Sequence, residues 1–135
     1  MALHLSSNDR KQLLHWAADA GQNECCGVLR GRDQKVMAVE CAANVAADPS
    51  RNFEIDPAAL IAVHKDVRTG GIPLLGYFHS HPNGLAEPSA SDIAQAAPDG
   101  LIWLIIAGGA VTAWRPIALG AHVTGFTPVP LVVEG

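Results

Sequence analysis

Residues 72–82 read Ile-Pro-Leu-Leu-Gly-Tyr-Phe-His-Ser-His-Pro, an apolar run that ends in two histidines and a proline. The composition and length of this run are typical of a buried strand, which Pro82 ends. Alternate residues of a strand point to the same face, so the imidazoles of His79 and His81 can converge on one point. The stretch therefore predicts a central strand that ends in two ligands of a metal site.

A third metal ligand follows this strand after a short loop. Residues 83–88 are predicted to form a polar loop, and residues 89–97 a short helix that Pro98 stops. Asp92 lies in the first turn of that helix, close enough along the chain for its carboxylate to return to the imidazoles. Two histidines and one aspartate suit zinc, and three protein ligands leave a fourth position for water, which favours catalysis over a structural role.

The segments around this core predict a sheet flanked by helices. One helix is expected over residues 8–20, after an N-cap among residues 6–8 and before a stop at Gly21. A second helix is expected to begin at Asp56-Pro57 and to end at Gly70-Gly71. The other predicted strands are Cys25–Leu29, Val36–Cys41, Phe53–Ile55, Leu101–Ala107, Val111–Pro116 and Val129–Val133. This order of elements predicts an α/β (α+β) fold with a central mixed β-sheet flanked by helices.

Composition and charge limit the classes of function. The 135 residues are 49% hydrophobic and 16% charged, which predicts one compact domain over residues 1–135. The net charge of -4 comes without any basic cluster, so nucleic acid is not an expected partner. The longest apolar run, Leu101–Ala107, is much shorter than the roughly 20 residues of a membrane span. With no signal peptide and three cysteines without disulfide spacing, we expect a cytoplasmic protein that does not bind membranes.

A hydrolytic metal site also needs a carboxylate that moves protons without binding the metal. Glu24, just before the predicted strand Cys25–Leu29, is the candidate for this role. That strand can neighbour the strand that carries the two histidines. The spacing along the chain does not by itself show that Glu24 reaches the metal.

Taken together, Glu24, the segment His79-Ser80-His81-Pro82, Ser89 and Asp92 resemble the motif of the JAMM metalloprotease family, also called MPN-plus. The resemblance covers nearly the whole chain and includes the segments 24–31, 53–57 and 75–82. It implies the JAMM/MPN sandwich, a cytidine-deaminase-like arrangement of sheet and helices. The small size of the chain resembles prokaryotic members, in which the insertions of eukaryotic relatives are short or missing.

The resemblance also implies a role for each residue of the motif. Zn²⁺ is expected to be bound by His79, His81 and Asp92, with Glu24 as the acid/base of a water attack and Ser89 as the hydroxyl that stabilises the oxyanion. The implied reaction is hydrolysis of a peptide or isopeptide bond after the C-terminal Gly-Gly of a ubiquitin-like or sulfur-carrier protein of the β-grasp fold. Neither the particular substrate, nor the pathway, nor formation of a homodimer follows from the sequence.

Simpler interpretations account for only part of the pattern. His79 and His81 can lie on the solvent face of an edge strand, but this leaves the spacing to Ser89 and Asp92 unexplained. Ser89 and Asp92 also fit a capping box, which is compatible with a metal site because a cap can orient Asp92.

Other classes of function fit less well. A thiol nucleophile at Cys25 or Cys26 lacks a basic neighbour that would stabilise a thiolate. A zinc nucleobase deaminase needs His-x-Glu and Pro-Cys-x-x-Cys, which this sequence does not contain. A non-catalytic MPN-type binding scaffold is the remaining alternative, and the presence of all five motif residues argues against it.

Overall fold

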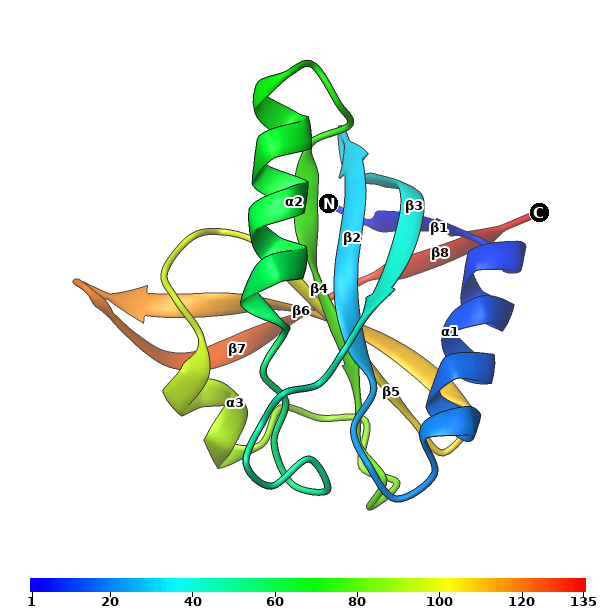
Figure 1. The fold of residues 1–135 in the computed structure, drawn as a ribbon, viewed down its shortest axis with the longest axis vertical. Helices are drawn as coiled ribbons and strands as arrows, with labels where there is room; N and C mark the ends of the chain where they lie inside the picture. Colours follow the sequence, from blue (N-terminus) through cyan, green and yellow to red (C-terminus); the bar gives the residue numbers. More distant parts are fainter.

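Eight strands form one curled sheet in the computed structural model, which describes all 135 residues (Figure 1). The strands are β1 (Leu3–Ser6), β2 (Cys26–Arg32), β3 (Lys35–Ala42), β4 (Leu74–Ser80), β5 (Ile102–Ala107), β6 (Ala110–Leu119), β7 (His122–Val129) and β8 (Leu131–Glu134). The helices are α1 (Ser7–Ala20), α2 (Pro57–Arg68) and α3 (Ala90–Gln95). Their mixed order along the chain confirms the predicted α+β class.

The sheet is mixed, and β4 lies near its centre. The strand order is β7-β6-β5-β4-β2-β3-β1-β8, with β4 antiparallel to β2 and parallel to β5. The two edge strands, β7 and β8, are consecutive in sequence, and β8 pairs with β1 in parallel. The sheet therefore curls until its edges approach each other, and the β6–β7 hairpin extends to one side (Figure 1).

Local sequence signals set the ends of the first two helices. The Ser6 hydroxyl accepts a hydrogen bond from the Asp9 amide at 3.0 Å, which caps α1. Gly21 ends the helix with a φ of 61°, a conformation that glycine adopts without steric cost. Asp56 caps α2, and Pro57 occupies its first turn, where no amide hydrogen is needed.

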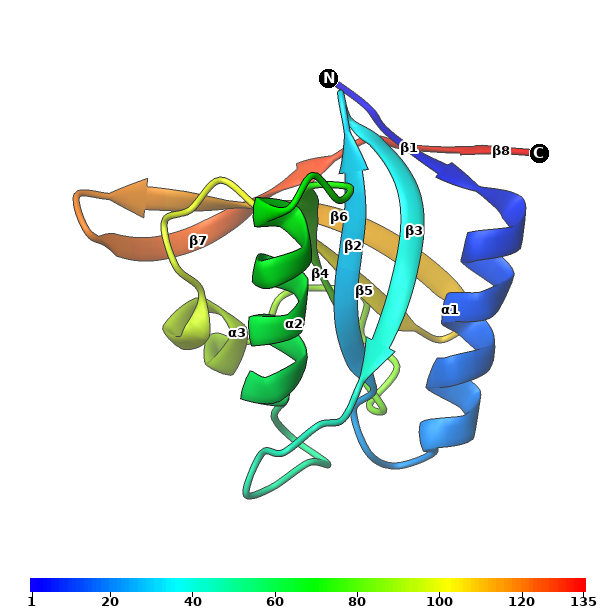
Figure 2. The same cartoon turned by 45° about the horizontal axis from the view of Figure 1, so that its top comes forward.

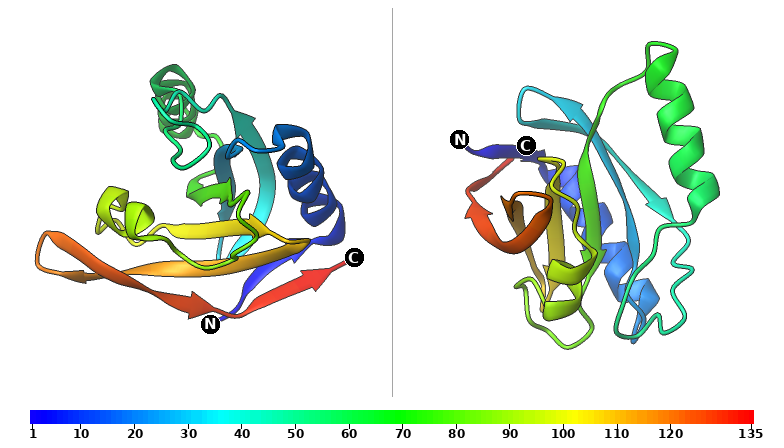
Figure 3. Two further views of the ribbon diagram at one scale, coloured as in Figure 1. Left: turned by 90° about the horizontal axis from the view of Figure 1, so that it is seen from below. Right: turned by 90° about the vertical axis from the view of Figure 1, so that its left-hand side faces the viewer.

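The helices lie on opposite faces of the sheet. Helix α1 lies inside the curl, against β1, β3 and β5, whereas α2 and α3 lie on the other face (Figure 2; Figure 3, left). This arrangement follows from the alternation of side chains along the central strands. Phe78 of β4 and Leu104 of β5 belong to the core against α1, whereas Trp103 of β5 belongs to the core with Phe53 and Val63.

The same alternation assigns a face to the histidines. Because Phe78 packs against Trp16 of α1, its neighbours Tyr77 and His79 point to the opposite face of β4. His79 is fully buried there, in ring contact with Phe53 and Trp103. The predicted metal strand therefore directs His79 into the layer between the sheet and helices α2 and α3.

The structure corrects several predicted elements. The expected strand Phe53–Ile55 is only a single bridge between Asn44 and Ile55. Strands β1 and β7 were not predicted, and the expected strand Val129–Val133 is divided between β7 and β8 at Pro130. The expected third helix ends at Gln95 instead of Ala97. None of the three helices is long and apolar enough to cross a membrane.

Candidate active site

Strand register explains how Glu24 meets residues more than 50 positions away in sequence. Strands β2 and β4 are antiparallel, with Cys26 opposite His79. Continuing the pairing by one residue brings Cys25 to Ser80, and the Ser80 hydroxyl accepts a hydrogen bond from the Cys25 amide at 2.8 Å. One residue further beyond the end of each strand, Glu24 lies opposite His81. The expected neighbourhood of the two strands is therefore confirmed.

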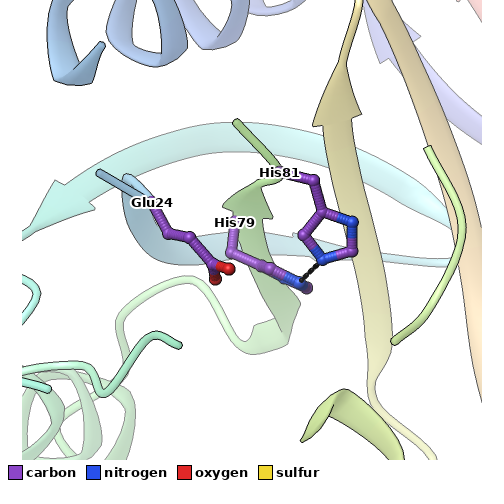
Figure 4. A group of neighbouring side chains, drawn as sticks. All are labelled: Glu24, His79 and His81. Carbon is purple, nitrogen blue, oxygen red and sulfur yellow. Dashed lines mark hydrogen bonds between the residues drawn. The ribbon is translucent and has the colours of Figure 1, made fainter. Parts of the chain in front are cut away.

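The predicted site residues converge within a few ångströms. The Nε2 atoms of His79 and His81 are 3.0 Å apart. The two carboxylate oxygens of Asp92 lie 3.1 Å from His79 Nε2 and 3.0 Å from His81 Nε2. Glu24 offers a carboxylate oxygen within 4.8 Å of both imidazoles, and Figure 4 shows its carboxylate directed toward them. All four of these side chains are buried.

The donor set and its spacing fit a zinc ion. Ligand atoms of a tetrahedral zinc lie about 2.0–2.2 Å from the metal and therefore about 3.3 Å from one another. The distances of 3.0–3.1 Å among His79, His81 and Asp92 are close to this spacing. Two imidazole nitrogens and one carboxylate are also the hard-to-borderline donors that zinc accepts. The three residues thus fit the metal that the sequence resemblance implies.

The backbone around His81 selects the nitrogen that can bind a metal. His81 Nδ1 lies 2.7 Å from the Leu85 carbonyl, which can only accept a hydrogen bond. Nδ1 therefore keeps its proton, and when the ring is neutral the lone pair is on Nε2, which faces the site. Sequence reasoning did not identify Leu85, because its contribution is a backbone carbonyl that carries no residue-specific signal.

A helix cap orients Asp92. The Ser89 hydroxyl accepts a hydrogen bond from the Asp92 amide at 3.1 Å, and the Asp92 carboxylate accepts one from the Ser89 amide at 2.9 Å. These two bonds form the capping box expected from the sequence. The same Asp92 oxygen that accepts from the Ser89 amide also faces His81, so the cap fixes the carboxylate on the side of the imidazoles.

Burial and hydrogen bonding shift the pKa values of Asp92 and His79. Burial alone would raise the pKa of Asp92, but hydrogen bonds from His79 and His81 outweigh this and hold that pKa below its usual range. Burial lowers the pKa of His79, and Asp92 only partly opposes the effect. Asp92 is therefore an anion and His79 is readily neutral, which are the forms that bind a metal.

Glu24 has the properties of a proton carrier. Burial raises the pKa of Glu24 to about 7, although the nearby His81 opposes this rise. Its Oε1 atom is buried without a hydrogen-bond partner in the protein. A carboxylate with a pKa near neutrality can both accept and release a proton at physiological pH. The orphaned oxygen also needs a polar partner, and a reacting water would supply one.

A polar cleft opens onto the site from solvent. Its volume is about 300 Å³, and Glu24, His81 and Ser89 form part of its wall. The other residues of the wall are Ser50, Arg51, Pro82 and Asn83. The cleft thus gives a substrate access to Glu24 and His81.

The cysteines take no part in the site. Cys25 and Cys26 are buried free thiols, and Cys41 is exposed. Burial raises the pKa of Cys25, and it raises the pKa of Cys26 to about 12. Thiols in these environments stay protonated near neutral pH, which agrees with the expectation that they are not nucleophiles.

Comparison with known proteins identifies the family. Residues 6–117 match the family described as prokaryotic homologs of the JAB domain. The chain is 32% identical over 109 residues to a desampylase from Haloferax volcanii, a match that covers 76% of this chain and 78% of the relative. It is 36% identical over 92 residues to a probable TtuB-protein conjugate cleaving protease from Thermus thermophilus, covering 68% of this chain and 59% of the relative.

Solved structures agree with this match. The solution structure of a protein from Desulfitobacterium hafniense superposes with a TM-score of 0.81 at 28% identity, covering 98% of this chain and 92% of that one. The chain therefore belongs to the family of prokaryotic JAB domain homologs, and the expected resemblance to the JAMM/MPN family and its fold is confirmed. It is an enzyme of this family, a JAMM-type metallopeptidase.

Proposed function

We propose that this metallopeptidase is a zinc-dependent isopeptidase that cleaves after the C-terminal Gly-Gly of a ubiquitin-like or sulfur-carrier protein of the β-grasp fold. The observation that carries the proposal is the convergence of two Nε2 atoms, the Asp92 carboxylate and the unpartnered Glu24 oxygen beside a polar cleft that Glu24 and His81 line. The names of two relatives, a desampylase and a protease that cleaves TtuB-protein conjugates, support the substrate class.

In this proposal His79, His81 and Asp92 hold the zinc ion. When bound, zinc acidifies a water molecule and polarises the scissile carbonyl. The protein contributes the orientation of the ligands. The Leu85 carbonyl fixes the tautomer of His81, and the capping box with Ser89 fixes the carboxylate of Asp92.

Glu24 moves the proton from the attacking water to the leaving group. Its carboxylate accepts the proton as the water oxygen bonds to the carbonyl carbon, and it returns this proton to the amine nitrogen as the carbon–nitrogen bond breaks. The products are a carboxylate on the Gly-Gly tail and a free amine. In the metal-free protein burial raises the pKa of Glu24 to about 7, which favours acceptance of the proton in the first step.

In the proposed mechanism the Ser89 hydroxyl donates a hydrogen bond to the oxyanion. Its hydroxyl oxygen already accepts a hydrogen bond from the Asp92 amide, so one lone pair is used. The hydroxyl proton remains available to a substrate in the cleft that Ser89 lines. A preorganised donor at this position stabilises the charge that develops on the carbonyl oxygen.

Incubation with a β-grasp protein whose Gly-Gly terminus is joined to a lysine side chain of a target protein tests the proposal, and a β-grasp protein extended beyond its Gly-Gly by a main-chain peptide bond serves as the comparison. Mass spectrometry should find a product that ends at the second glycine. Replacing that glycine by valine should slow cleavage strongly, since a β-branched side chain next to the scissile carbonyl hinders the extended approach. If valine is cut as fast as glycine, or if cutting occurs only elsewhere, the ubiquitin-like substrate class is wrong even though a metallopeptidase remains.

The non-catalytic binding scaffold, which was the alternative from the sequence, fits this site less well than an enzyme does. Such a scaffold has no need for a buried, unpartnered carboxylate oxygen beside two imidazoles, which costs folding free energy. Zinc-loaded protein that binds a β-grasp partner and never cleaves its conjugates would favour the scaffold.

A further inference from the structure

The loop of residues 44–56, which connects β3 to α2, contacts the elements that carry Glu24, His79 and Asp92. We propose that this loop, hereafter the clamp, positions Glu24 for proton transfer, and that Asn44 is the positioning residue at its base. The proposal rests on the isopeptidase function proposed above. It assigns a role to a residue that neither contacts the substrate cleft nor binds the metal.

The side chain of Asn44 uses its full hydrogen-bonding capacity. Its Nδ2 atom donates to the Glu24 carbonyl at 2.9 Å and to the Asn52 carbonyl at 3.0 Å. Its Oδ1 atom accepts from the amides of Ala46 and Glu54, both at 3.0 Å. Two donors and two acceptors are all that an asparagine side chain offers. Asn44 therefore ties both arms of the clamp to the backbone of Glu24.

The sheet does not hold Glu24 by itself. Strand β2 begins at Cys26, so Glu24 precedes the strand and takes no part in its ladder. The clamp supplies hydrogen-bond partners for the backbone amide and the backbone carbonyl of Glu24. The Glu24 amide donates to the Pro49 carbonyl at 2.7 Å, and the Glu24 carbonyl accepts from Asn44. Removing the donor on one side leaves the carbonyl of a buried residue unpaired and frees its peptide to rotate.

The far arm of the clamp contacts the proposed metal ligands. The Phe53 ring stacks on the His79 imidazole, with 4.3 Å between the ring centroids and 18° between the planes. This contact matters because His79 Nδ1 has no hydrogen-bond partner that would fix the ring. Ring packing by Phe53 and Trp103 therefore holds the side of the imidazole opposite its contact with Asp92.

The clamp is also bonded to the helix that carries Asp92. The Ser91 hydroxyl donates to the Asn52 side-chain oxygen, and the Gln95 side-chain amide donates to the Phe53 carbonyl at 2.8 Å. These two residues lie on either side of Asp92 in α3. The clamp thus holds the proton carrier in fixed relation to the metal ligands from β4 and α3.

A purely structural role for Asn44 predicts different behaviour. If Asn44 only stabilised the fold, its removal would lower the free energy of unfolding and leave kcat per folded, zinc-loaded molecule unchanged. If it positions Glu24, kcat falls in the folded enzyme. An error of about 1 Å in a reacting group can reduce the rate by roughly a hundredfold.

The test compares Asn44→Ala and Asn44→Asp with the control Asn23→Ala. Asn44→Asp loses both donor bonds, to the Glu24 and Asn52 carbonyls, and keeps the acceptor for Ala46 and Glu54. It therefore removes the tie between the clamp and Glu24 even where Asn44→Ala folds poorly. Asn23 precedes Glu24 and is exposed, so its replacement makes the same chemical change beside the same residue. We expect kcat per zinc-loaded molecule to fall about 10- to 100-fold in both Asn44 variants with KM within threefold, and to stay unchanged in the control.

Hydrogen exchange of backbone amides gives a readout that does not depend on activity. In metal-free Asn44→Asp, the Glu24 amide should exchange faster than in the wild type, even though its hydrogen-bond acceptor, the Pro49 carbonyl, is unchanged. The Ala46 and Glu54 amides should stay protected, because the substituted side chain keeps the oxygen that accepts from them. Unchanged exchange at Glu24 together with unchanged kcat refutes the clamp. If the wild-type enzyme cleaves no conjugate, the proposed isopeptidase function is refuted. Faster exchange at Glu24 in Asn44→Asp would still support the positioning of Glu24 by Asn44.

Discussion

Replacing Glu24 by glutamine should stabilise the metal-free protein, and the gain should depend on pH. Burial raises the pKa of Glu24 from 4.5 to about 7 in the folded protein. Because the folded state holds this proton more tightly than the unfolded state, raising the pH above 4.5 costs folding free energy until the folded carboxyl group also ionises near pH 7. The cost reaches about 3 kcal/mol above pH 7 and is about 1 kcal/mol at pH 5.

Chemical denaturation of chelator-treated protein at pH 5 and pH 8 measures this difference. Metal-free Glu24→Gln should be more stable than the metal-free wild type by about 3 kcal/mol at pH 8, which corresponds to a rise in Tm on the order of 10 °C. The advantage should shrink to about 1 kcal/mol at pH 5. The exposed Glu54 provides the control, because Glu54→Gln should change the stability by less than about 0.5 kcal/mol at either pH.

If Glu24→Gln is no more stable than the wild type at pH 8, the Glu24 carboxylate is well solvated and the buried, unpartnered Oε1 atom is misassigned. Saturation with zinc should reduce the advantage, because a nearby cation favours the ionised carboxylate.

The remaining predictions concern the metal and its surroundings. Purified protein should bind about one zinc per chain, and His79→Ala or Asp92→Ala should lower that content in elemental analysis; undiminished zinc would refute the ligand assignment. A chelator should abolish cleavage, whereas alkylation of the exposed Cys41 should not; the reverse pattern would point to a thiol enzyme. Phe53→Leu should weaken zinc binding about tenfold in a chelator competition. Phe126→Leu is the matched control, because Phe126 contacts Trp103 and not His79. Equal zinc affinities of the two variants would refute the proposal that Phe53 orients His79.

The sequence predicts those parts of the fold whose signals are local. Ser6, Gly21 and the pair Asp56-Pro57 act as helix ends in the structure because capping depends on a few adjacent residues. The apolar run before His79 likewise forms the central strand β4. In these segments the pattern and the final contacts involve the same few residues.

Non-local pairing accounts for the missed strands. Strand β1 has only four residues, and its main partner β8 comes from the other end of the chain. Strand β7 contains Gly125 and Pro128, which indicate a loop in sequence, but an edge strand tolerates both because only one of its sides is paired. The apolar stretch Phe53–Ile55 forms no ladder, since the Asn44 side chain satisfies part of its backbone.

The candidate site was likewise predictable only where its residues lie close together in the sequence. The spacing of His79, His81 and Asp92 was readable because one strand and the next helix carry all three. Glu24 was connected to them only through family resemblance, because strand pairing between β2 and β4 brings it there. Asn44 gave no signal, since its role consists entirely of bonds to residues distant in sequence or to backbone atoms.

Turnover and zinc content of Glu24→Gln, measured together on one conjugate, test the central claim most directly. In the proposed division of roles Glu24 moves a proton and does not hold the metal, so the variant should retain about one zinc per chain and lose roughly 10² to 10⁴ in kcat. Undiminished kcat would remove Glu24 from the mechanism. Loss of zinc would instead make Glu24 a ligand and contradict the division of roles between Glu24 and the trio His79, His81 and Asp92.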